Sequence, residues 1–124
     1  MGKTRAIRKF VSAYLAATDG KTYHRRAAAN AVYPYKVYML TRANLEDTAM
    51  DVYDLTVDIY DRGDNPGRVE DLADAIEEMF RYANLPQDTI LPTIWRENRQ
   101  WVEDDDKELQ RLQLRFTIQL YTKS

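Results

Sequence analysis

The chain has 124 residues, a formal net charge of −2 from 18 basic and 20 acidic residues, and no cysteine. This length favours a single domain over residues 1–124. The lack of cysteine excludes disulfides and thiolate metal sites and allows a reducing compartment. The balanced charge argues against a general nucleic-acid binder. No apolar run is long enough to span a bilayer or to act as a secretory signal, so we expect an intracellular soluble domain with no membrane partner.

The first predicted element is a helix over about residues 4–17, where apolar residues recur at helical spacing. Gly20 can end this helix in a left-handed conformation. Residues 21–32 give a weak signal, which predicts mostly loop with room for a short strand at its beginning. The N-terminal part of the chain is rich in basic residues, which are Lys3, Arg5, Arg8, Lys9, Lys21, Arg25 and Arg26.

A strand is predicted after Pro34, because the residue before a proline is disfavoured in the helical region. From Tyr35 to about Thr41 the odd positions are apolar and alternate with Lys36 and Tyr38, which places Lys36 on the polar side of the strand. Residues 42–48 are polar and are expected to turn the chain antiparallel into the next strand.

The stretch over residues 53–80 predicts a strand, a turn and a covering helix. In the strand, apolar residues occupy the odd positions from Tyr53 to Ile59, whereas Asp54 and Asp58 share the polar side. In the turn, Asn65 is suited to cap the helix and Pro66 to begin it. The helix is predicted over residues 68–80, and Asn84 and Pro86 are expected to stop it.

The last predicted unit is a β-hairpin. Residues 90–102 form a long extended segment, residues 103–108 an acidic turn, and residues 112–121 an amphipathic strand with strict alternation. The predicted fold is therefore α+β: a mainly antiparallel sheet of four strands, or five with the short one after Gly20, covered on one face by two helices.

Residues that could carry chemistry are few. Asp54 and Asp58 could act as an acid and base pair or hold a divalent ion. The favoured interpretation is an exposed face of the sheet on which Lys36 or Arg115 pairs with these carboxylates across neighbouring strands. His24 has no identifiable base, nucleophile or metal partner. We therefore predict no catalytic, metal-binding or cofactor-binding residue and no cofactor.

Neither of two loop motifs fits a ligand. The run 103–108 lacks the glycine and the spaced ligands of a calcium loop, and the turn 63–67 lacks the lysine of a phosphate loop. Nine tyrosines and two tryptophans favour cross-strand packing and protein interfaces. The candidate subunit or partner interface comprises Asp54, Asp58, Trp95, Arg96, Arg99, Trp101, Asp104, Asp105, Asp106, Arg115, Arg25 and Arg26.

Four stretches resemble one family, in order. They are Tyr-Pro-Tyr at residues 33–35 leading into a strand, Leu-Thr-Val-Asp-Ile-Tyr-Asp at 55–61, Val-Glu-Asp-Leu-Ala-Asp-Ala-Ile at 69–76 and Arg-Phe-Thr-Ile-Gln-Leu-Tyr at 115–121. From about Tyr33 to the C-terminus the chain resembles the tail terminator, or tail completion, proteins of long-tailed bacteriophages. The first 32 residues follow no pattern of that family.

The resemblance implies a structural virion protein with no catalytic residues. Such proteins form hexameric rings at the head-proximal end of the tail tube, stop tube polymerisation and provide the docking surface for the head connector. The implied partners are other copies of this chain, the tail tube protein and the head connector, with DNA only in passage; assembly would take place in the host cytoplasm.

Three alternatives stay open. The nearest is another neck, head-tail adaptor or tail-tube-related protein. A second is a small divalent-metal enzyme that uses Asp54 and Asp58. A third is a nucleic-acid module that uses Arg5, Arg8, Arg25 and Arg26, for which steeply salt-dependent DNA binding would be the sign.

Overall fold

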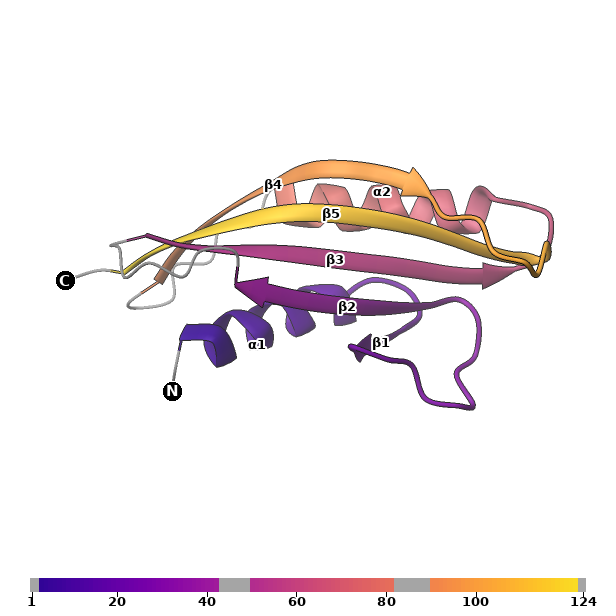
Figure 1. The fold of residues 1–124 in the computed structure, drawn as a ribbon, viewed down its shortest axis with the longest axis horizontal. Helices are drawn as coiled ribbons and strands as arrows, with labels where there is room; N and C mark the ends of the chain where they lie inside the picture. The colour runs from indigo at the N-terminus through magenta and orange to yellow at the C-terminus, as the bar shows by residue number, and fades with distance from the viewer. Residues whose placement is uncertain (1–2, 43–49, 82–89, 123–124) are drawn as a thin grey trace.

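The computed structural model describes residues 3–42, 50–81 and 90–122 (Figure 1). In chain order the elements are α1 (Lys3–Ala16), β1 (Lys21–His24), β2 (Tyr35–Arg42), β3 (Met50–Arg62), α2 (Gly67–Arg81), β4 (Ile90–Trp101) and β5 (Leu109–Thr122). The predicted helices and strands form, including the short strand after Gly20. The turn expected after Arg42 and the stop signals Asn84 and Pro86 lie outside the described residues.

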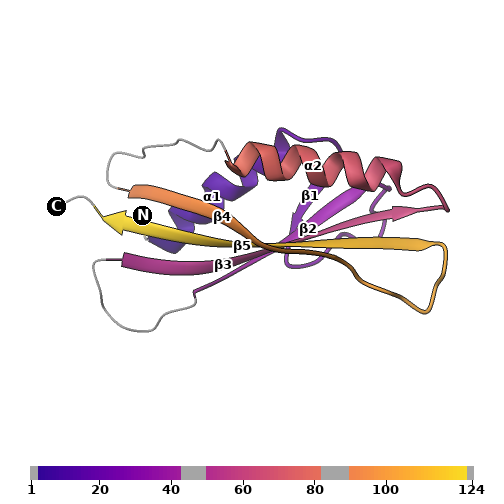
Figure 2. The same cartoon turned by 90° about the horizontal axis from the view of Figure 1, so that it is seen from above.

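The five strands form one sheet in the order β1-β2-β3-β5-β4. β1 pairs with β2 in parallel, and the remaining neighbours pair antiparallel. The prediction of a mainly antiparallel sheet is thus confirmed. Figure 2 shows α1 and α2 on the same side of the sheet. The other side, which we call the open face, has no helix of the described chain on it. Neither described helix is long and apolar enough to cross a membrane.

The core lies between the two helices and the sheet. Its buried side chains come from α1, α2, β2, β3 and β5. Phe80 of α2 joins the layers, because its ring lies 5.9 Å from that of Tyr14 in α1 and 5.0 Å from that of Phe116 in β5. Full burial of such a side chain contributes about 1.5–3 kcal/mol. The helices are therefore held to the sheet by one shared apolar cluster.

The predicted orientation of β2 is wrong. Lys36 and Tyr38 are buried under the helices, with 0% and 2% of their surface exposed, whereas Met39 on the open face is 48% exposed. The even positions face the core because their polar ends find partners there. The Tyr38 hydroxyl forms a hydrogen bond with Ser12 of α1, and the Lys36 ammonium reaches the end of the same helix.

Lys36 caps the C-terminus of α1. Its Nζ donates to the carbonyl oxygens of Leu15, Asp19 and Gly20 at 2.7, 2.9 and 3.0 Å, and to the Thr18 hydroxyl at 2.6 Å and its carbonyl at 3.3 Å. The last carbonyls of a helix lack intrahelical donors, so a cation here is favourable. Burial lowers the pKa of Lys36 to about 8, which leaves the ammonium protonated at pH 7. α1 is thereby fixed to β2.

Gly20 makes this cap geometrically feasible. Its φ is +81°, and a Cβ at this position would lie 2.6 Å from the carbonyl oxygen of Pro34. Only glycine combines this backbone conformation with so close an approach. The chain can therefore leave α1, present its carbonyls to Lys36 and enter β1 within a few residues.

The start of α2 is anchored to the end of β3. The Asn65 side chain accepts from the Gly67 N–H at 2.9 Å, as predicted for a helix cap. Arg68 donates to both carboxylate oxygens of buried Asp61, at 2.9 and 2.5 Å. The hydrogen bond from Arg68 is the main reason that the pKa of Asp61 is lowered, against the opposing effect of burial.

Asp61→Asn is expected to lower the free energy of unfolding at pH 7 by about 1 kcal/mol. This is below the usual contribution of about 1.5–3 kcal/mol for hydrogen bonds to charged groups, because Arg68 is largely exposed. Since the folded-state pKa lies below that of the unfolded chain, this contribution is present above about pH 4 and is lost as the pH falls through the folded-state pKa. Urea titrations of both proteins at pH 7 and pH 3 should show the gap closing. Asp64→Asn, on the exposed turn, is the control; an equal gap at both pH values would contradict the assignment.

Candidate functional site

The open face carries an ordered array of polar and aromatic side chains. Its centre is Asp58 of β3, whose Oδ1 accepts from Nε of Arg111 and Nε2 of Gln113, both at 3.1 Å. The Arg111 guanidinium also lies 5.5 Å from the centroid of the Tyr60 ring. Both donors lie on β5, because the register pairs Asp58 with Gln113 and Tyr60 with Arg111. Asp58 is thus fixed by an ion pair and is not a free base.

Tyrosines extend the array toward β1. Tyr60 stacks on Tyr35 with the ring centroids 5.1 Å apart, and Tyr35 in turn contacts Tyr33 at 5.3 Å and Tyr23 at 5.9 Å. Burial raises the pKa of both Tyr35 and Tyr60, so the hydroxyls stay neutral at physiological pH. The sequence interpretation of aromatic cross-strand packing therefore applies to the four tyrosines of this group.

The expected partners of Asp58 are partly wrong. Lys36 cannot form an ion pair with Asp58, because Lys36 lies on the helix side of the sheet. Arg111 takes that place, and the sequence did not single it out. Arg111 is one of the polar residues that alternate with the apolar ones along β5. Only the strand register shows which of these polar residues lies near Asp58.

Asp54 and Asp58 do share the open face, but they do not form one site. They are separated by four residues of extended strand, which is about 13 Å. Oxygen ligands of one divalent ion each lie about 2.0–2.6 Å from it, so these two carboxylates cannot bind the same ion. Asp54 instead lines a separate hollow of ≈ 500 Å³ with Arg115 and Glu97. Among the described residues no group of three carboxylate or imidazole side chains is placed to hold a metal.

Arg96 and Arg99 face α2. Arg96 forms an ion pair with Glu77 at 2.9 Å, and Arg99 with Glu77 and Asp74 at 2.9 and 2.6 Å. Simple alternation would put positions 96 and 99 on opposite faces of β4. The structure has a β-bulge between Arg96 and Asn98, which shifts the register and directs both arginines to the helix. These two candidates therefore have partners within the chain.

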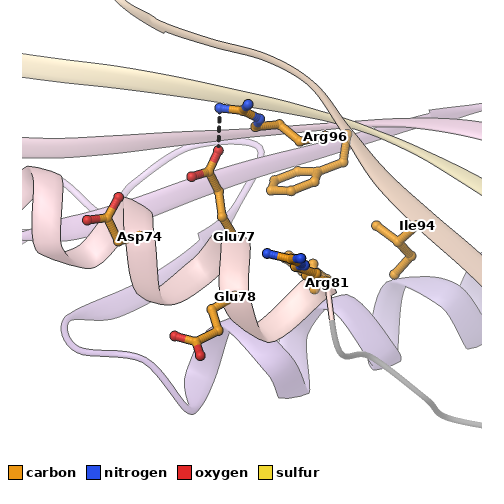
Figure 3. A pocket seen from close by; sticks show the side chains of 8 residues that line it. Asp74, Glu77, Glu78, Arg81, Ile94 and Arg96 are labelled. Atoms are coloured by element: carbon orange, nitrogen blue, oxygen red, sulfur yellow. Dashed lines mark ion pairs between the residues drawn. The ribbon is translucent and has the colours of Figure 1, made fainter.

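The same ion pairs line a hollow between α2 and β4. Figure 3 shows Glu77 and Arg96 facing each other there, with Ile94 on the β4 side. The hollow measures ≈ 520 Å³ and also includes the apolar rings of Phe80 and Phe116. It combines an apolar floor with a charged rim, but no nucleophile or base among its described lining residues is set for catalysis.

Trp95 and Trp101 lie on β4 away from each other. Trp95 is opposite Thr117 in the register. Trp101 is opposite Leu112, is 47% exposed and lines a hollow with Gly63 and Pro66 at the start of α2. Trp101 is thus an accessible aromatic side chain at the hairpin end of the molecule.

The acidic turn, residues 103–108, has part of its charge neutralised by an arginine of the same chain. Arg62 forms ion pairs with Asp106 at 2.8 Å and with Glu108 at 3.4 Å. The hydrogen bond from Arg62 lowers the pKa of Asp106. Asp104 accepts from the Asp106 N–H at 3.0 Å, which fixes the turn, and Asp105 is exposed. Arg25 and Arg26, in contrast, follow the end of β1 and are exposed.

Comparison with known proteins gives a clear result. A search of curated proteins found no match. A search of solved structures found a chain of a structure described as the virion of a native gene transfer agent (GTA) particle, with a TM-score of 0.64, 13% sequence identity, and coverage of 90% of this chain and 84% of that one. At this identity the likeness concerns the fold.

The family comparison is decisive. The model of the family described as "Tail completion protein gp17" matches residues 6–121, which is nearly the whole chain and includes the N-terminal segment where the sequence showed no family pattern. A match of this extent shows membership. The chain therefore belongs to the tail completion protein gp17 family, a family of structural proteins of the bacteriophage virion and not of enzymes.

Proposed function

We propose that this protein closes the head-proximal end of the phage tail tube as a ring of identical copies, a hexamer in the virion. The ring stops polymerisation of the tube protein and presents the surface on which the head connector docks. The observation that carries the proposal is the family match over residues 6–121. As a virion component the protein associates with tail and head proteins; the tube protein and the connector are the proposed partners.

Two surfaces of the fold support this proposal. A ring of identical head-to-tail subunits requires two different patches on every copy. The described helices pack on one side of the sheet only (Figure 2). The open face presents paired charges and stacked tyrosines. A distinct charged surface lies at the acidic turn. DNA is expected to meet the ring only in passage, because the chain has a net charge of −2.

Capping of purified tail tubes tests this proposal. Tubes incubated with the protein should carry a ring at one end in electron micrographs and should stop growing when tube protein is added. Native mass spectrometry across concentration should be run in parallel. A monomer in isolation is compatible with the proposal, since the tube can template the ring; a strict monomer that also fails to bind tube ends would contradict it.

Binding to the head connector without binding to tube ends would have a different meaning. It would identify the protein as another neck or head-tail adaptor component. Including purified connector in the same experiment separates these two roles.

A further inference from the structure

The outer edge of β2 is covered along only part of its length. β1 pairs with Tyr35 to Tyr38 and no further, although β2 continues to Arg42. Arg25 ends β1: its φ is +72°, and its N–H donates to the Tyr38 carbonyl oxygen at 2.8 Å. Backbone groups two residues apart point to the same side of a strand, so those of Leu40 point to this edge as well. No strand of the described chain lies beside them.

A hollow of ≈ 330 Å³ lies where β1 ends. We call it the β2 notch and define it by Arg8 of α1, His24 and Arg25 at the end of β1, and Met39 and Leu40 of β2. The notch is positively charged, since Arg8 and Arg25 have no ion pair within the described part of the chain. Burial first, and then the charges of Arg8 and Arg25, lower the pKa of His24, which agrees with an uncompensated positive potential.

The complementary surface is the turn between β4 and β5. Glu103 and Asp105 are exposed, and neither has an ion pair within the described residues, whereas Arg62 already holds Asp106 and Glu108. The turn lies at one end of the long axis of the molecule, while β2 beyond Tyr38 runs toward the other end, where the N-terminus lies (Figure 1). One copy cannot bring the two together, but successive copies can.

We infer that the β2 notch receives the acidic turn of a neighbouring copy. The carboxylates of Glu103 and Asp105 meet Arg8 and Arg25, and the backbone of the turn lies along the free edge at Leu40, as in strand addition. The contact is head-to-tail, which is the type that closes into a ring. It rests on the proposed ring and adds which surfaces form the subunit interface.

Charge reversal in the full chain tests the contact. One variant carries Arg8→Glu and Arg25→Glu, a second carries Glu103→Lys and Asp105→Lys, and a third carries all four changes. Ring formation on purified tail tubes is measured at low and moderate salt. Each two-residue variant should lose about tenfold or more in ring yield, and the four-residue variant should recover most of it, because both patches are reversed together.

Matched controls are Lys9→Glu on α1 and Glu78→Lys on α2, which reverse exposed charges outside both patches and should leave ring yield unchanged. Urea unfolding of every variant shows whether the fold is kept. Wild-type yield in both two-residue variants, or no recovery in the folded four-residue variant, would overturn the contact while leaving the ring intact. Failure of wild-type protein to form rings would overturn the proposed function and the contact together. DNA binding of the same variants is measured in parallel. Its loss in the Arg8→Glu, Arg25→Glu variant without loss of ring yield would make the notch a nucleic-acid site and would also overturn the contact.

Discussion

Replacing Lys36 by methionine is expected to lower the free energy of unfolding by about 2–4 kcal/mol. Methionine keeps most of the apolar stem but removes the ammonium group that donates to Leu15, Thr18, Asp19 and Gly20. The Leu15 carbonyl oxygen would keep the Thr18 N–H and hydroxyl as donors, but the partly buried carbonyl oxygens of Thr18, Asp19 and Gly20 would lose the ammonium group. A buried polar group left without a partner costs about 1–3 kcal/mol. The removed desolvation cost of the cation offsets only part of this loss.

Urea unfolding at pH 7, followed by far-UV circular dichroism, measures the effect. Lys21→Met is the matched control, because Lys21 lies on the neighbouring strand but is exposed; it should change stability by no more than about 0.5 kcal/mol. Equal unfolding midpoints for Lys36→Met and the wild type would show that the ammonium group does not stabilise the end of α1.

Phe80→Ala is expected to destabilise the protein by about 3–5 kcal/mol, the usual range for loss of a buried phenylalanine ring. The ring is 2% exposed and contacts both Tyr14 and Phe116, so its removal leaves a cavity where α1, α2 and the sheet meet. The surrounding side chains belong to three elements and cannot collapse into the space without moving a helix.

Phe80→Leu separates the cavity from the loss of the aromatic contacts, and should cost about 1.5 kcal/mol or less if volume dominates. Differential scanning calorimetry of both variants gives the comparison. A cost for Phe80→Ala below about 1 kcal/mol would mean that α2 is not held to the sheet through this residue.

Apart from β1, whose segment gives only a weak signal, the order and type of the elements could be predicted from the sequence because each has a strong local signal. The odd positions from Tyr53 to Ile59 and the even positions from Leu112 to Ile118 are buried as their alternation indicates. The cap at Asn65 and the hairpin around the acidic turn also follow local rules. These features depend on residues near one another in the chain.

The orientation of β2 could not be predicted in the same way. Val37 and Met39 are apolar and Lys36 is charged, so alternation favours the wrong side. The deciding interaction is between Lys36 and the carbonyls that end α1, with Gly20 bringing them close. No periodicity in β2 contains this information, because it depends on where a helix earlier in the chain ends in space.

The candidate site shows the same division. Alternation predicts the polar side of β3 correctly, but it does not predict the partners of Asp58 on β5, because the pairing of Asp58 with Gln113 depends on the strand register. Residue type alone places Arg96 and Arg99 in an interface, but the β-bulge between Arg96 and Asn98 directs both side chains to α2. A one-residue insertion in a ladder leaves no clear mark in the sequence.

The strand order also has a consequence for the emerging chain during synthesis. β5 is the last strand in sequence, yet it lies between β3 and β4 in the sheet. Until β5 leaves the ribosome, β3 has one unpaired edge and β4 has no neighbour to join. The ladder between β3 and β5 joins residues as distant as Met50 and Tyr121, a pairing that is slow to form because a long loop must close first. A nascent chain therefore exposes an aggregation-prone strand edge until β5 has been synthesised.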